Sequence, residues 1–142
     1  MNKQGLTLLE ITIVLGILLL IFAMGTPVAL DFYLNYQLSS EQRVLISVLK
    51  KARNLALVNY NESNHGVYLN SAAFTLFQGN NYLSRDASRD QNFPRAQAVS
   101  ISGLTEFVFE ALSGRTSSST LTLTDGRKNK FIYINEEGGI NF

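Results

Sequence analysis

The chain has 142 residues, of which 12 are Lys or Arg, 11 are Asp or Glu and none is Cys. A formal net charge of +1 gives no overall attraction to nucleic acid or acidic lipid, and the lack of cysteine excludes disulfides and thiolate metal sites. A chain of this length accommodates one compact domain together with an N-terminal segment.

The N-terminal segment is apolar over a long stretch. Residues 11–30 contain no charged side chain, and Lys3 is the only charged side chain before Glu10. As a helix, this stretch would measure about 30 Å, the thickness of the hydrocarbon core of a bilayer. The sequence therefore predicts a transmembrane helix over residues 6–30. Its N-terminus should be cytoplasmic because the positive charge precedes it, so that residues 31–142 form an extracytoplasmic head.

The next stretch, residues 31–60, has the spacing of an amphipathic helix. Its polar residues Glu41, Gln42, Lys50, Lys51 and Arg53 lie off the apolar stripe. No turn cluster separates this helix from the apolar stretch, so one helix is expected from about residue 6 to residue 60, bent at Gly25 and Pro27. The stripe itself consists of Leu34, Leu38, Leu45, Leu49, Ala52 and Ala56.

From residue 65 onward the chain alternates apolar and polar residues in short runs, which predicts antiparallel strands. The runs cover residues 66–70, 74–79, 98–103, 106–112, 120–126, 130–135 and 138–142. Residues 80–95 and 113–120 lack this period and are expected to be loops. The predicted fold class is α+β, a long N-terminal helix packed on an antiparallel sheet at residues 65–142. The expected buried face consists of Val67, Leu69, Val99, Ile101, Leu121, Leu123, Ile132 and Ile134.

The stretch "QGLTLLE" resembles the N-terminal signal of type IV pilins and type II secretion pseudopilins. Members of that family have a short polar leader ending in glycine, an apolar residue at the new N-terminus and glutamate at the fifth mature position. Here these features fall on residues 1–5, Leu6 and Glu10, and Pro27 stands where many members also have proline. Leu6 replaces the more usual phenylalanine. The resemblance implies cleavage after Gly5 by a prepilin peptidase, N-methylation of Leu6 and roles for Glu10 and Pro27 in assembly.

The physical chemistry of Glu10 agrees with this resemblance. A carboxylate in a membrane segment costs up to about 3 kcal/mol and is retained where it finds a partner. Cleavage would create one, because the new α-amine on Leu6 has a reference pKa near 8 and is cationic at neutral pH. This amine lies one helical turn from Glu10 of the same chain or, in a polymer, belongs to a neighbouring subunit, in which case the pairing would set the register as subunits stack.

The rest of the chain resembles the H-type minor pseudopilins and related minor pilins, in "GVYLNSAAFTLFQG" and "TLTLTDGRKNKFIYINEEGGINF". The resemblance implies a minor structural subunit of a pilus or secretion pseudopilus, held in the bacterial inner membrane before assembly and with its head in the periplasm or outside the cell. Its expected partners are other subunits, the prepilin peptidase and the membrane.

Two other functions stay open at this point. Some minor pilins bind DNA during uptake, and Arg127, Lys128 and Lys130 could contact phosphates. The nearby Asp125, together with Glu136 and Glu137, favours an ordinary charged turn. Alternatively, the chain could be a membrane-anchored extracellular binding protein that does not polymerise.

Catalysis and metal binding find little support in the sequence. His65 is the only histidine, and the motifs of nucleotide, zinc and serine chemistry are absent, so we expect no enzyme and no cofactor. His65 is interpreted as a loop residue between helix and strand. Asp86 and Asp90 are oxygen ligands of the kind that Ca²⁺ takes, but arginines lie between and beside them and they lack EF-hand spacing, so no metal site is predicted.

Overall fold

The computed structural model describes residue 5 and residues 7–142, except that the side chains of residues 24–28 lie outside the described part. The chain forms two compact units, Met1–Leu34 and Asn35–Phe142. The second unit, Asn35–Phe142, is called the head.

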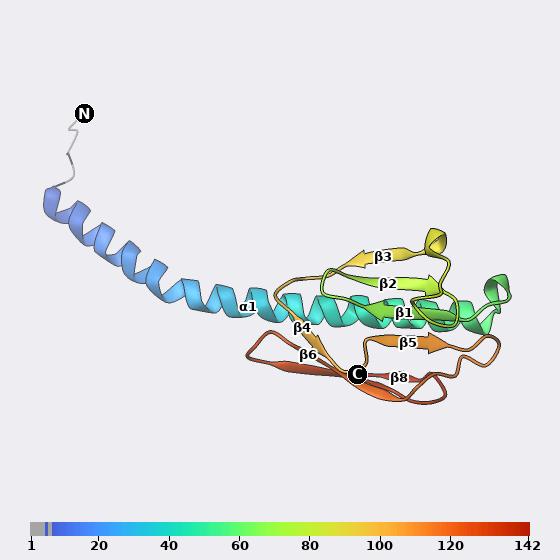
Figure 1. Cartoon of the computed structure of the whole chain (residues 1–142). Coiled ribbons are helices and arrows are strands. Elements are labelled where there is room, and N and C mark those ends of the chain that lie inside the picture. The colour runs from blue at the N-terminus through green and yellow to red at the C-terminus, as the bar shows by residue number, and fades with distance from the viewer. Residues whose placement is uncertain (1–4, 6) are drawn as a thin grey trace. The chain divides into compact units, whose positions relative to one another are not determined.

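One long α-helix, α1, runs from Leu8 to Leu57 (Figure 1). This confirms the single helix expected from the lack of a turn cluster between the apolar and amphipathic stretches. The helix stops where Asn59 adopts a left-handed conformation with φ 51°, which asparagine tolerates better than most residues. A short 3₁₀ turn, η1 (Tyr60–Glu62), then leads into the first strand.

Within the described residues, no helix combines the length and the apolarity needed for a membrane span. The transmembrane segment expected over residues 6–30 includes Leu6 and the side chains of residues 24–28, which lie outside the described part.

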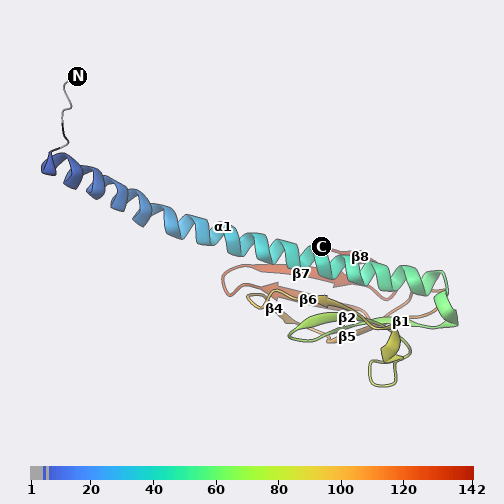
Figure 2. The same cartoon turned by 90° about the horizontal axis from the view of Figure 1, so that it is seen from above.

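The head contains two four-stranded antiparallel sheets. Sheet 1 has the order β3-β2-β1-β5 and consists of β1 (His65–Leu69), β2 (Ala73–Gln78), β3 (Gln91–Pro94) and β5 (Glu106–Phe109). Sheet 2 has the order β4-β6-β7-β8 and consists of β4 (Ser100–Ser102), β6 (Ser119–Thr124), β7 (Asn129–Ile134) and β8 (Ile140–Asn141). The strands of both sheets lie alongside the part of α1 that belongs to the head (Figures 1 and 2). The α+β class and the antiparallel pairing predicted from the sequence are confirmed.

The core of the head lies between this part of α1 and the two sheets. Leu45, Leu49, Ala52 and Ala56 of the predicted helical stripe are completely buried there. Of the predicted strand face, only Ile101 is partly exposed. Burying one leucine side chain contributes about 1.5–3 kcal/mol, so this core holds the helix segment and both sheets together as one unit.

Two expectations about the strands are wrong. The strands form two sheets rather than one, because β5 pairs with β1 while β6 pairs with β7 and β4. The segment 80–95 is not only a loop, since it contains a 3₁₀ turn, η2 (Ala87–Arg89), and strand β3. Glu41 and Gln42, which lie off the predicted apolar stripe, are also buried, because each finds polar partners inside the head.

Candidate functional site

The residues that carry the expected processing signal lie at the start of α1. Gly5 is exposed, and Leu6 lies outside the described residues. Thr7 precedes the helix, and its Oγ1 accepts a hydrogen bond from the backbone N–H of Glu10 over 3.2 Å. This is the first half of a capping box, which stabilises a helix start by satisfying a free N–H group.

Glu10 therefore lies in the first turn of α1, where the helix dipole favours a negative charge. Its side chain is exposed, and none of the other described residues forms an ion pair with it. The spacing of threonine and glutamate in "TLLE" could have predicted this cap from the sequence. Pro27 lies within the helical bounds of α1, but its side chain is outside the described part.

The helix surface around and after Glu10, over residues 8–22, is apolar and exposed. Its large side chains have exposed fractions between 45% (Leu18) and 83% (Leu8). A continuous exposed apolar surface marks a site of protein or membrane interaction. The exposed residues are Leu8, Leu9, Ile11, Ile13, Val14, Leu15, Ile17, Leu18, Leu19, Leu20, Ile21 and Phe22.

The basic residues considered for DNA binding lie in and beside the β6–β7 hairpin loop. Asp125 Oδ1 accepts hydrogen bonds from the backbone N–H groups of Lys128 (2.7 Å) and Arg127 (2.9 Å). These bonds lower the pKa of Asp125, so the carboxylate is ionised at neutral pH. An anion thus lies within the basic cluster of Arg127, Lys128 and Lys130, which weakens its attraction for phosphate.

The two aspartates considered for calcium are held by arginines instead. Arg85 Nε lies 2.8 Å from Asp90 Oδ2, and Arg89 Nε lies 3.1 Å from Asp86 Oδ2. The described residues contain no group of three or more acidic, histidine or cysteine side chains that could hold a metal ion.

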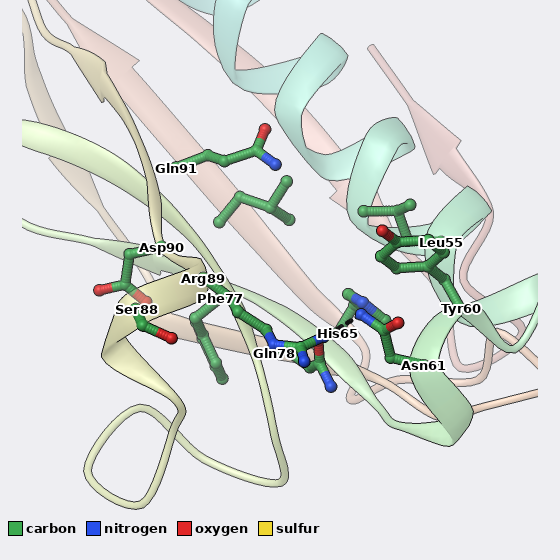
Figure 3. Close-up of a pocket in the computed structure, with 11 residues that line it drawn as sticks. Leu55, Tyr60, Asn61, His65, Phe77, Gln78, Ser88, Arg89, Asp90 and Gln91 are labelled. Atoms are coloured by element: carbon green, nitrogen blue, oxygen red, sulfur yellow. Dashed lines mark hydrogen bonds between the residues drawn. The ribbon is translucent and has the colours of Figure 1, made fainter.

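The head also contains a pocket of about 370 Å³ between the end of α1 and sheet 1 (Figure 3). Its floor is made by the strand positions that face the helix. His65 of β1 pairs with Gln78 of β2, and Leu76 of β2 pairs with Gln91 of β3. Leu55 and Tyr60 line the helix side, while Asn61, Phe77, Ser88, Arg89 and Asp90 complete the lining.

His65 is buried, with an exposed fraction of 3%, and is the first residue of β1 rather than a loop residue as expected. Its Nδ1 lies 3.0 Å from the carbonyl oxygen of Ser63, so Nδ1 carries the proton and Nε2 is left as an acceptor. Burial lowers the pKa of His65, although the bond to Ser63 opposes this shift. The imidazole is therefore neutral at pH 7.

Hydrogen bonds fix the orientation of the Gln78 amide on the pocket floor. Gln78 Oε1 accepts from Asn61 Nδ2 over 3.0 Å and from Arg89 Nη1 over 3.2 Å, which orients the amide and leaves Gln78 Nε2 as a donor. Asn61 and Glu62 both have positive φ, near 50°. Strained backbone of this kind is concentrated at functional sites, because the surrounding structure must hold it in place.

Sequence reasoning missed this pocket. The sequence does contain a signal for it: three polar residues, His65, Gln78 and Gln91, occupy helix-facing positions of neighbouring strands. The other helix-facing positions of these strands are apolar. This pattern could be recognised only with the strand register, and β3 was not predicted.

Comparison of the chain with family models, with curated proteins and with solved structures finds no match.

Proposed function

We propose that the chain is a minor subunit of a type IV pilus or type II secretion pseudopilus. In this proposal a prepilin peptidase removes residues 1–5, Leu6 becomes the methylated N-terminus, and the apolar part of α1 leaves the membrane to pack against the helices of other subunits. The head, with its amphipathic helix segment on antiparallel sheets, is then a pilin fold.

The observation that carries the proposal is the sequence of features at the N-terminus. A glycine–leucine junction is followed by a first-turn carboxylate and then directly by an exposed apolar helix surface. An uncovered surface of this extent requires lipid or other helices around it. A filament core would supply such helices, and Glu10 would pair with the amine that cleavage creates.

The test is to replace Glu10 by Gln, which removes the charge but preserves the shape of the side chain. In a bacterium that carries the assembly machinery, we expect Glu10→Gln to be inserted and cleaved normally but to be missing from sheared filaments, as measured by immunoblot. The backbone N–H that donates to Thr7 is unaffected by this change, so the helix cap is kept.

Thr7→Ala is the matched control, because it removes the capping hydroxyl and keeps the carboxylate. Loss of this cap costs about 1 kcal/mol of local helix stability, and we expect Thr7→Ala to enter filaments. Wild-type incorporation of Glu10→Gln would contradict the assembly role. Absence of the wild-type chain from filaments would favour a non-polymerising anchored protein.

A further inference from the structure

The two charged side chains that line the pocket at the end of sheet 1, Arg89 and Asp90, are each held in an ion pair. Arg89 is paired with Asp86, and Asp90 is paired with Arg85. Hydrogen bonds from Ser88 lower the pKa of Asp86, so this carboxylate is ionised at neutral pH and the charge of Arg89 is compensated. An anionic ligand would have to compete with Asp86, and a cationic ligand would approach Arg89. The lining therefore suits a neutral ligand.

The floor of the pocket presents one acceptor beside one donor. His65 Nε2 accepts because Nδ1 is occupied by Ser63, and Gln78 Nε2 donates because Oε1 is occupied by Asn61 and Arg89. His65 and Gln78 are directly opposite each other in the β1–β2 ladder, where side chains lie about 5 Å apart. Their complement is a ligand with two adjacent polar groups, one donating and one accepting.

The remaining lining adds an aromatic surface and further amides. The ring of Tyr60 lies 6.0 Å from that of His65, and Tyr60 is more than half exposed. Gln91 Oε1 accepts from Lys51 Nζ over 2.6 Å, which leaves its NH₂ group as a second donor. The volume of about 370 Å³ lies within the range of small-molecule sites.

We propose that this pocket binds a neutral sugar ring, either as a free monosaccharide or as the end of a glycan. One ring hydroxyl donates to His65 Nε2, the neighbouring hydroxyl accepts from Gln78 Nε2, and a face of the ring lies against Tyr60. Hydroxyl groups both donate and accept, so two adjacent ones match the floor without leaving either polar group unpaired. The site is separate from the N-terminal assembly signal and does not depend on filament formation.

The chain offers a single-site probe for this proposal, because His65 is its only histidine. The imidazole Cε1–H signal in an NMR spectrum therefore reports on the pocket floor alone. Full-length protein should be purified in a detergent without a sugar headgroup. It should then be titrated with glucose, galactose, mannose and maltotriose, and with glucose 6-phosphate and acetamide as comparison probes.

We expect a saturable shift of the His65 signal with at least one neutral sugar, at a Kd on the order of 1 mM for a ligand of this size. Saturation by a monosaccharide would assign a free sugar, and saturation by maltotriose alone would assign a glycan end. Binding of glucose 6-phosphate or acetamide in preference to every neutral sugar would overturn the proposal. So would the absence of a shift with all the probes.

Gln78→Glu tests the donor on the pocket floor most selectively. It keeps an acceptor oxygen for Asn61 and Arg89 but replaces the donor with a second acceptor. We expect sugar affinity to fall by about tenfold or more, since a buried hydroxyl then loses its donor. Gln97→Glu introduces the same charge at an exposed position outside this pocket and should bind like the wild type. Equal affinity of wild type and Gln78→Glu would also overturn the proposal.

Discussion

Glu10 contributes to the start of α1 and is also the residue to which we assign a role in subunit assembly. Glu10 belongs to the first turn of α1, where its backbone N–H donates to the capping hydroxyl of Thr7. Because this hydrogen bond uses only the backbone of Glu10, the cap itself does not require a carboxylate at this position. At an exposed site, the helix dipole stabilises the carboxylate by about 0.3–1 kcal/mol. This is less than the cost of up to about 3 kcal/mol for placing a carboxylate in a membrane segment. In the proposed function, the amine created by cleavage supplies the charged partner that the cap does not provide.

His65 is the residue whose protonation should alter head stability. Burial lowers its pKa below the ordinary value of 6.5, so the unfolded chain binds a proton more readily than the folded chain does. By linkage, the free energy of unfolding rises with pH wherever the unfolded state holds more protons. The stabilisation by neutral His65 is present above pH 6.5 and is lost as the pH falls toward the folded-state pKa.

We therefore expect the free energy of unfolding of the head to decrease as the pH falls from about 7 to about 5. Urea unfolding followed by the near-UV circular dichroism of the tyrosines measures this slope. His65→Gln has no titrating group at this position and should flatten the slope in that range. Asp86 and Asp125, whose pKa values lie below 3.8, lose their contributions only at lower pH. An unchanged slope in His65→Gln would contradict the assignment.

At the scale of elements, a buried ion pair ties α1 to the segment after β3. Arg95 Nε lies 3.1 Å from Glu41 Oε1, and both side chains are at least nine-tenths buried. The second oxygen of Glu41 accepts from the backbone N–H of Ala96, and Arg95 also donates to the carbonyl oxygens of Asn70 and Val99. The pair thus satisfies backbone groups from several segments at once.

Removing the cation of this pair should be costly. Arg95→Gln leaves the Glu41 carboxylate buried without its ion partner, and we expect a loss of about 3 kcal/mol or more in urea unfolding. Arg89→Gln removes the cation of an exposed pair, whose side chains are about half accessible, and should cost less than about 1 kcal/mol. Similar losses in the two variants would show that the buried pair contributes no more than the exposed one.

The elements also show which parts of the fold could be predicted from the sequence. Strands β1, β2, β6 and β7 follow from short apolar runs bounded by turn residues, with strict alternation only in β6, and α1 follows from its apolar spacing. β3 was missed because "QNFP" has only one apolar side chain facing the core, Phe93, and its pairing with β2 depends on contacts distant in the sequence. The burial of Glu41 could not be predicted, because its partner Arg95 lies 54 positions away in the sequence.

The candidate sites also differ in whether they depend on local sequence or on contacts between distant segments. The proposed N-terminal signal is local, because the resemblance rests on Gly5, Leu6, Glu10 and Pro27, which are close in the sequence. The pocket needs the register of three strands, and neither the two-sheet arrangement nor the positive φ values of Asn61 and Glu62 can be inferred from residue type. The structure also changed the interpretation of His65, from a loop residue to the buried floor of a pocket.

At the scale of the whole molecule, the two units differ in how far their apolar side chains are buried. The head buries its own apolar residues between α1 and two sheets and is complete as a packed unit. The helix surface at residues 8–22 is left uncovered in the isolated chain. A subunit that passes from membrane to filament would need both properties: a head that stays folded throughout and a helix that exchanges one apolar environment for another.

Intact-mass spectrometry after co-expression with a prepilin peptidase tests this account most directly. No described residue beyond its chain neighbours lies within 4 Å of the position that a Cβ on Gly5 would take, so Gly5→Val serves as the uncleaved control. We predict that the wild-type chain loses residues 1–5 and gains one methyl group on Leu6, while Gly5→Val keeps its full mass. A wild-type product that retains residues 1–5 would contradict the account.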